Sequence, residues 1–209
     1  MIRKKNSEEK GSVSVKKDIG ISMPVYPAPC LVVGVYDENG VPGGMTAAWG
    51  GVCCSEPTCV SVSVQKVRYS YGGIVKHQAF TVNIPSERFV AEMDYFGLFS
   101  GRTERKFEVS GLTPRRGDLV NAPLIEEFPI SLECRVVRSE ELGSHVLFVG
   151  QVVKTWALEE CLNGDGYPDP LKVRPVIFAP RYGTYYGLGQ IVGKAYSEGK
   201  RVKERKLNP

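Results

Sequence analysis

The sequence predicts a mainly β domain with helices at its periphery, and two observations support this prediction. The 209 residues include 23 Gly and 14 Pro, which is many for a helical bundle and normal for short strands joined by turns. The strand-like segments do not alternate with helices as a doubly wound sheet requires. We therefore expect one domain over residues 21–195, folded as a closed or nearly closed antiparallel barrel with a few outer helices, between flexible basic tails at 1–20 and 196–209.

The first half of the domain consists of strand signals. Residues 29–36 form the apolar run PCLVVGVY, and 37–40 follow as the hairpin turn DENG, whose Asn-Gly pair tolerates positive φ. The next strand is expected near 43–49. In a third strand, at 58–64, serine alternates with valine, so one face of that strand is apolar and the other is polar.

The second half combines helices and strands. A short helix is expected at 74–76, and the run AFTVNIP at 79–85 indicates a strand. Between residues 87 and 99 apolar side chains recur among charges at the spacing of an amphipathic helix. Further strands are predicted at 130–137, 146–153 and 182–187.

The positive charge of the chain belongs to its tails. The formal net charge is +4, but residues 1–17 and 194–209 each sum to +4, so residues 18–193 sum to −4. The basic residues of the tails are not interleaved with aromatic ones as a stacking platform requires, and we expect no nucleic-acid partner. The charged N-terminus does not resemble a secretory signal, and no apolar run approaches the ~18 residues of a membrane span. The sequence thus predicts a cytoplasmic protein without a membrane partner.

The cysteines and histidines do not form a metal-binding pattern. No two of the six cysteines have C-x-x-C spacing, and His77 and His145 are the two histidines of the chain, so neither a zinc ribbon nor an HExxH helix can form. We expect reduced cysteines that are mostly buried. Cys53, Cys54 and Cys59 form the one cluster where redox chemistry would be expected.

Several catalytic motifs are absent. The segment GLGQIVGK at 187–194 has neither the Gly-x4-Gly-Lys spacing of a Walker loop nor the third small residue of a dinucleotide fingerprint. The chain has no Gly-x-Ser-x-Gly nucleophile elbow. A hydrolase or a Rossmann-type dehydrogenase is therefore not expected.

A run of small residues is the first of three segments that suggest a binding site. It comprises residues 43–51, GGMTAAWGG. Small side chains let a flat ligand approach the backbone, whose N–H groups can bond to ring carbonyls and nitrogens. The alternative is a glycine-rich strand corner of a barrel.

The other two segments carry cations and hydroxyls. Residues 63–71, SVQKVRYSY, end a strand and enter a helix, where an anionic phosphate would meet the helix N-terminus, the Ser70 hydroxyl and the Arg68 guanidinium. A helix N-cap at Ser70 beside a solvated arginine is the alternative. Residues 99–107, FSGRTERKF, place three cations and two hydroxyls between aromatic residues, and a solvated charged loop would have the same composition.

In their order and spacing these segments resemble the flavin reductase-like, FMN-binding split-barrel family, and in particular its flavoredoxin-like branch. The similarity extends from about residue 26 to about residue 194, through YPAPCLVVGVYDENG, MTAAWGG, SVSVQKVRYSY, AFTVNIP, SGRTERKF and RPVIFAPRYGTYYGLGQIVGKAY. The resemblance implies a six-stranded Greek-key barrel with non-covalent FMN at the interface of a homodimer.

The resemblance also implies roles for individual residues. No catalytic side chain is implied, because the flavin carries the chemistry. His145 matches a histidine that lies near the nicotinamide in related flavin reductases, although it could instead bond to a backbone carbonyl. The implied cofactor contacts are Met45, Thr46, Ala47, Ala48 and Trp49 along the flavin, Ser63, Val64 and Gln65 at the ring edge or ribityl chain, Arg68, Ser70 and Tyr71 at the phosphate, and Ser100, Gly101 and Lys106 completing the phosphate pocket.

Two residues depart from the family pattern. The family often has Asn where this chain has Gly43, and Arg or Lys where it has Gln65. The second departure removes a cation from the ring edge, which should lower the reduction potential of the flavin unless Lys66 or backbone N–H groups replace it.

The function implied by the resemblance is that of an oxidoreductase. It would accept a hydride from NADH or NADPH onto bound FMN and pass electrons to a free flavin, a ferric complex or a redox protein. The missing dinucleotide fingerprint agrees with a nicotinamide that is held loosely against the flavin. The alternative is a flavoredoxin-type electron carrier without significant NAD(P)H turnover.

Overall fold

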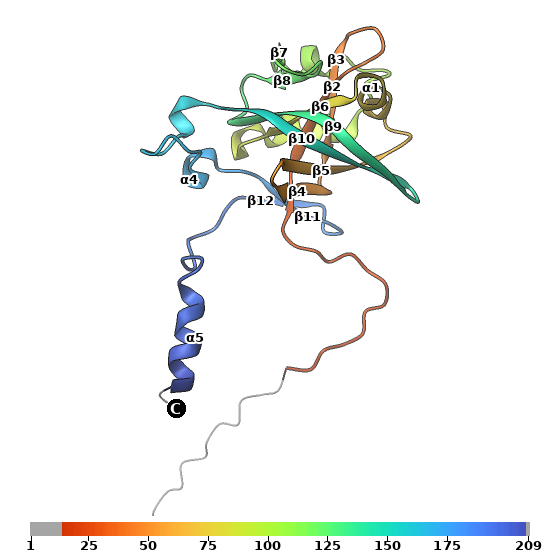
Figure 1. The fold of residues 1–209 in the computed structure, drawn as a ribbon. Helices are drawn as coiled ribbons and strands as arrows, with labels where there is room; N and C mark the ends of the chain where they lie inside the picture. The colour runs from red at the N-terminus through yellow and green to blue at the C-terminus, as the bar shows by residue number, and fades with distance from the viewer. Residues whose placement is uncertain (1–13, 208–209) are drawn as a thin grey trace, which may run out of the picture.

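A sheet of seven antiparallel strands forms the barrel (Figure 1). The computed structural model describes residues 14–207, and the strand order in this sheet is β3-β2-β6-β9-β10-β5-β4. The mainly β fold class expected from the sequence is confirmed. The strands are β2 (Leu31–Tyr36), β3 (Pro42–Ala47), β4 (Gly50–Ser55), β5 (Thr58–Gln65), β6 (Ala79–Ile84), β9 (Ile130–Leu142) and β10 (His145–Ala157).

The barrel closes through a strand that is interrupted at Ala48 and Trp49. Before this break β3 pairs with β2, and after it β4 pairs with β5, so the two ends of the sheet order are adjacent in the chain. The backbone N–H of Ser63 donates to the Trp49 carbonyl at 2.8 Å. Counted as one interrupted strand, β3 and β4 complete the six strands of the expected barrel.

The barrel interior is filled by the apolar face that the alternation in β5 predicts. Val60, Val62 and Val64 are buried, whereas the serines between them are half-buried. Phe80 of β6 and Phe148 of β10 belong to the same core cluster. Because successive side chains of a strand point to opposite faces, the polar positions of β5 face away from this core.

Helices cover the outside of the barrel through a second apolar cluster. Val32, Met93, Phe96, Phe107 and Ile125 are all buried in it. The helical elements are α1 (Tyr69–His77), the 3-10 turn η1 (Glu87–Phe89), α2 (Val90–Leu98), α3 (Lys106–Ser110), the 3-10 turn η2 (Glu159–Cys161) and α4 (Pro170–Val173). The helix expected at 87–99 is thus divided into η1 and α2, and the one expected at 74–76 is longer.

Short strands complete the fold. The strand expected at 182–187 is β12 (Thr184–Tyr186), which joins β11 (Ile177–Ala179) and β1 (Ala28–Pro29) in a three-stranded sheet. A further pair is formed by β7 (Pro114–Arg116) and β8 (Pro123–Ile125). Figure 1 places β4, β11 and β12 at the lower end of the barrel, where both terminal segments leave it.

Asn83 connects the barrel to the layer outside it. Its buried amide donates to the Val32 carbonyl at 3.0 Å and to Thr81 Oγ1 at 2.9 Å. Its Oδ1 accepts from the Ile125 N–H at 3.1 Å and from Ser131 Oγ at 2.7 Å. One side chain therefore joins β2, β6, β8 and β9, and its polar atoms are satisfied despite complete burial.

The two tails differ from each other. Residues 1–13 of the expected N-terminal tail lie outside the described residues. The basic C-terminal tail expected at 196–209 contains α5 (Glu198–Leu207). Its Glu, Lys and Arg residues are good helix formers, and Arg201 pairs with Glu198 at 2.7 Å, one turn away. None of the helices in residues 14–207 is long and apolar enough to cross a membrane.

The cysteines are free and mostly buried, as expected. Cys30, Cys59, Cys134 and Cys161 are buried, and Cys53 and Cys54 are exposed on β4. Burial raises the pKa of the Cys30 and Cys134 thiols to about 12. These two thiols are therefore uncharged apolar groups of the interior.

Candidate functional site

Two adjoining cavities form a groove beside the strand break. Their volumes are about 230 Å³ and 310 Å³, and both are lined by Met45, Gln65 and Arg68. The first cavity is completed by Val67, Tyr69, Ser70, Phe96, Leu98, Phe99, Ser100, Gly101 and Lys106. The second is completed by Met23, Thr46, Ala47, Ala48, Trp49, Ser63, His145, Phe178, Pro180 and Arg181.

Every charged residue that lines the groove is a cation. These residues are Arg68, Lys106 and Arg181, and no Asp or Glu among residues 14–207 lines either cavity. The contrast is informative because residues 18–193 carry a net charge of −4. Since like charges concentrated in a cleft attract an oppositely charged ligand, the groove is suited to an anion.

Lys106 forms the floor of the first cavity. Its side chain is buried, and its Nζ donates to the carbonyls of Gly44 at 2.9 Å and Phe96 at 2.8 Å. Burial lowers the pKa of Lys106 to about 8, and the charge of Arg68 acts in the same direction. An anion bound beside this ammonium would stabilise its charged form.

The N-terminus of α1 forms the wall next to Lys106. Arg68 is the residue that precedes the helix. Its Nη1 donates to the carbonyl of Gly97, in the last turn of α2, at 3.2 Å, and this bond holds the guanidinium against that end of α2. Ser70 is buried in the first turn, without a role as N-cap. A nine-residue helix presents free backbone N–H groups and positive potential at this end.

The loop 99–105 forms the rim of the first cavity. The Ser100 carbonyl accepts from the N–H groups of Thr103 and Glu104, at 3.1 Å and 3.0 Å, which folds the loop into a turn. Gly101 lies against the Tyr69 ring, where a Cβ atom would approach a ring carbon to 2.7 Å. A glycine is needed here because of this close approach.

The second cavity is bounded by the strand break. The Thr46 hydroxyl donates to the Met93 carbonyl and so ties β3 to α2. β3 is the terminal strand of the sheet, so one edge of its backbone is not used by the sheet ladder. The Trp49 side chain is 43% exposed at the mouth of the cavity. This arrangement provides apolar contacts and backbone hydrogen-bonding groups for a flat ligand.

His145 lies at the same mouth. Its ring centre is 4.8 Å from that of Trp49, with the ring planes at 49°. Its Nδ1 is 2.8 Å from Ser144 Oγ, and it pairs with Gln65 across β10 and β5. The hydrogen bond with Ser144 orients the imidazole, and within the described part of the chain it has no backbone carbonyl partner.

Most of the residues that the sequence assigned to the cofactor lie together in this groove. The exceptions are Val64, which is fully buried in the barrel core, and Tyr71, whose ring packs 5.9 Å from Phe148. Neither side chain lines the groove. The residues that do are Met45, Thr46, Ala47, Ala48, Trp49, Ser63, Gln65, Arg68, Ser70, Ser100, Gly101 and Lys106.

Sequence reasoning missed the contribution of the C-terminal segment. Phe178, Pro180 and Arg181 reach the second cavity from the end of β11. Arg181 has φ 72°, a left-handed conformation that is uncommon outside glycine. The residues lie in the closing motif that resembled the family, but no local pattern indicated that this motif returns to the groove.

The fold is a split β-barrel, and its cationic groove is a candidate site for an anionic ligand. The chain belongs to the flavin reductase-like domain family, whose model matches residues 23–180. Within that family it falls in the flavoredoxin-like branch, since it is similar to two flavoredoxins of known structure.

These similarities extend over most of the chain. It is 43% identical to flavoredoxin of Desulfovibrio vulgaris (Miyazaki F), with a TM-score of 0.85 over 88% of this chain and 100% of that one. It is 30% identical to flavoredoxin from Methanosarcina acetivorans, with a TM-score of 0.86 over 90% and 100%. A ferric-chelate reductase (NAD(P)H) of Archaeoglobus fulgidus is 24% identical over 62% of this chain and 76% of the relative.

Proposed function

We propose that this protein binds FMN non-covalently in the groove and acts in electron transfer. The observation that carries the proposal is the all-cationic lining of a groove in an otherwise acidic body. FMN is a planar ring with an anionic phosphate tail, and the groove has an apolar end and a cationic end. The similarity to flavoredoxins supports the same ligand.

The phosphate end of FMN fits the first cavity. Lys106, Arg68 and the first turn of α1 supply positive potential there, and Ser70 and Ser100 supply hydroxyls. The ring fits the second cavity, where Met45 and Trp49 exclude water from one side of it. When bound, the flavin supplies the hydride and electron chemistry, and the chain supplies binding, orientation and electrostatics.

Replacing Arg68 with Gln should weaken FMN binding by about tenfold or more, because a charge-assisted hydrogen bond contributes about 1.5–3 kcal/mol. Flavin fluorescence quenching measures the affinity after the native chromophore has been released by acid and identified. Arg138→Gln, the same change at an exposed residue of β9 paired with Glu140, is the matched control. Equal affinities of the two variants would move the phosphate site elsewhere.

FMN affinity should fall as pH rises above about 8. The pKa of Lys106 is lowered to about 8, so below that pH the ammonium is already charged when FMN arrives. Above it the lysine is neutral in the free protein, and binding requires proton uptake, which costs up to about tenfold in affinity per pH unit. Fluorescence titrations from pH 6.5 to about 9.5 test this. A Lys106→Met variant should bind weakly and lose the pH dependence, and a wild-type affinity that is flat across this range contradicts the assignment.

We infer further that NADH or NADPH donates a hydride to the bound FMN. The mouth of the second cavity is open at Trp49 and His145, where a nicotinamide can approach the ring, and the match to a ferric-chelate reductase (NAD(P)H) supports this activity. The imidazole of His145 is a candidate to orient the nicotinamide amide, and a free flavin, a ferric complex or a redox protein would accept the electrons. A carrier without NAD(P)H turnover is the competing function, favoured by the similarity to flavoredoxins.

Anaerobic stopped-flow mixing with each nucleotide separates these two functions. A hydride acceptor should lose its visible flavin absorbance with a rate that saturates in nucleotide. His145→Ala should slow this step several-fold with FMN affinity retained. The control is His77→Ala, at a histidine that does not line the groove and is bonded to the Asp37 carbonyl, and it should leave the rate unchanged. No loss of absorbance with either nucleotide favours the carrier.

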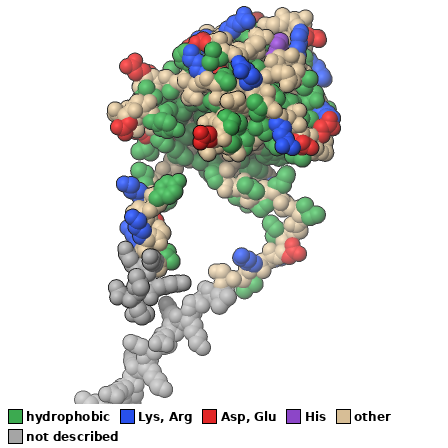
Figure 2. Space-filling view, viewed as in Figure 1, with side chains coloured by type: hydrophobic (Ala, Val, Ile, Leu, Met, Phe, Trp, Pro, Cys, Tyr) green, Lys and Arg blue, Asp and Glu red, His purple; other side chains and the backbone are tan. Residues whose placement is uncertain are grey.

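We also propose that two copies of the chain form a homodimer whose interface borders the mouth of the groove, so that the partner narrows the mouth and leaves room for a nicotinamide to enter. Trp49 is 43% exposed there, Val52 of β4 is 77% exposed, and Met23 lines the groove from an extended, largely exposed segment. Figure 2 shows hydrophobic side chains on the lower part of the body, where both terminal segments leave it. An exposed apolar surface of this kind marks an interaction site, and a two-fold partner would shield one side of both grooves.

Light scattering should give about twice the 23.0 kDa of one chain. Val52→Asp should shift the protein toward monomer and weaken FMN binding, because it charges the covered surface. Val137→Asp, at an exposed valine of β9, should leave both properties unchanged. If the Val52→Asp protein is a monomer and binds FMN as tightly as the unchanged protein, the partner has no role in the site.

A further inference from the structure

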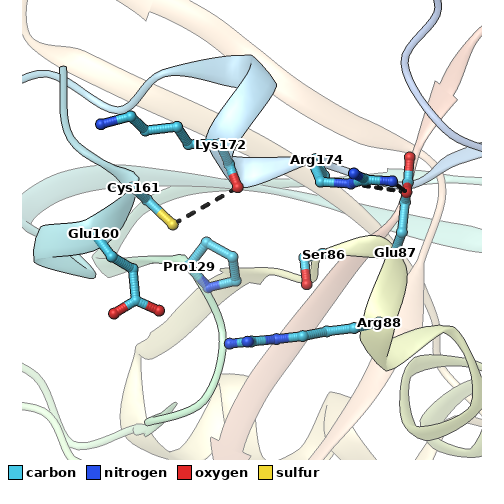
Figure 3. A pocket seen from close by; sticks show the side chains of 8 residues that line it. All are labelled: Ser86, Glu87, Arg88, Pro129, Glu160, Cys161, Lys172 and Arg174. Carbon is cyan, nitrogen blue, oxygen red and sulfur yellow. Dashed lines mark hydrogen bonds and ion pairs between the residues drawn. The ribbon is translucent and has the colours of Figure 1, made fainter.

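Another cavity, outside the groove, is lined by different residues. Its volume is about 430 Å³, and it shares no lining residue with the groove. Figure 3 shows the side chains that line it, which come from η1, η2, α4 and the loop before β9: Ser86, Glu87, Arg88, Pro129, Glu160, Cys161, Lys172 and Arg174.

Ser86 gives this cavity an unsatisfied polar atom. The residue is 7% exposed, and its Oγ has no hydrogen-bond partner within the described part of the chain. Its backbone is fixed by a bridge to Pro175. Figure 3 shows the hydroxyl directed toward the Arg88 side chain. Because a buried hydroxyl without a partner is unfavourable, such an atom in a cavity points to a ligand that accepts a hydrogen bond from it.

The charges around the cavity are not equivalent. Arg174 is neutralised by Glu87, to which its Nε and Nη2 donate at 3.0 Å and 2.5 Å. The Lys172 ammonium donates to the Leu162 carbonyl at 2.5 Å. Arg88, by contrast, makes no ion pair or side-chain hydrogen bond among residues 14–207, and its guanidinium carbon lies 4.8 Å from the centre of the Phe89 ring. Its donor fork is free to bind a planar oxyanion.

Cys161 and Pro129 form a less polar part of the wall. The buried Cys161 thiol is 3.9 Å from the Lys172 carbonyl, and Figure 3 shows Pro129 next to it. Burial raises the pKa of Cys161, the charge of Glu160 adds to this, and the cations Arg88 and Lys172 oppose it. The thiol is therefore a neutral, weakly polar wall. The Glu160 carboxylate on the other side disfavours an anion of high charge.

We propose that this cavity binds a small aliphatic monocarboxylate. The carboxylate would accept hydrogen bonds from Ser86 Oγ and the Arg88 guanidinium, with the hydrocarbon part against Pro129 and Cys161. A cavity of about 430 Å³ is in the size range of small-molecule sites and leaves room beyond a bare inorganic anion. The site is independent of the flavin, so this proposal does not rest on the function of the groove.

Butyrate is the probe, and isothermal titration calorimetry is the measurement. Butyrate titrated into the full-length protein as purified should give a saturable heat with a dissociation constant on the order of 1 mM. Butyramide, which has the same shape without the charge, should give no saturable heat. Inorganic phosphate should bind more weakly than butyrate.

Two variants locate the contacts. Arg88→Gln should weaken butyrate binding by about tenfold or more, whereas Arg138→Gln, the same change on β9, should leave it within about twofold. Ser86→Ala should weaken binding several-fold and also raise the melting temperature of the protein without butyrate, because it removes an unsatisfied buried hydroxyl.

Other outcomes would overturn the proposal. If butyrate does not bind, or if butyramide binds equally well, the cavity does not recognise a carboxylate. Tighter binding of phosphate than of butyrate would replace the organic acid with an inorganic anion. A lower melting temperature of Ser86→Ala would show that the hydroxyl is satisfied within the protein and is not reserved for a ligand.

Discussion

The buried ammonium of Lys106 is the interaction on which the groove depends. It joins the first turn of α3 to β3 through the Gly44 carbonyl and to α2 through the Phe96 carbonyl. Transfer of a cation from water to the interior is costly unless oxygen atoms replace its hydration. Two carbonyls do so in part, and burial together with the nearby Arg68 charge lowers the pKa of Lys106. The fold thus holds a charge that an anionic ligand would stabilise further, at the point where three elements meet.

The strand break at Ala48 and Trp49 links barrel closure to the site. Ala47, Ala48 and Trp49 end β3, form the break before β4 and line the groove. Gly50, the first residue of β4, packs closely on β5, since a Cβ atom there would lie 2.5 Å from the Ser61 carbonyl oxygen. The run of small residues has both of the roles that the sequence left open: it is a barrel corner, and it borders the candidate binding site.

Local sequence patterns predicted which strand residues lie in the core, but not which distant segments meet at the groove. The alternation in β5 placed Val60 and Val62 in the core, and the same alternation puts Val64 there, although the family resemblance assigned it to the cofactor. The burial of Lys106 could not be read from its neighbours, because a charged run gives no sign that one of its cations packs under a helix. The return of Arg181 to the groove depends on the pairing of β11 with β1, which is a tertiary contact between distant segments.

The two ends of the groove differ in a way that restricts how electrons would move in the proposed complex. The Lys106 end is enclosed by α1, α2 and the loop at 99–105, and it holds buried charge. The other end opens at Trp49 and His145, which are aromatic, and Arg181 is its one cation beyond the shared Arg68. A ligand anchored by its anionic tail at the closed end must present its ring at the open end. The reductant and the acceptor would then use the same mouth in turn, and a two-fold partner bordering that mouth would help to select them.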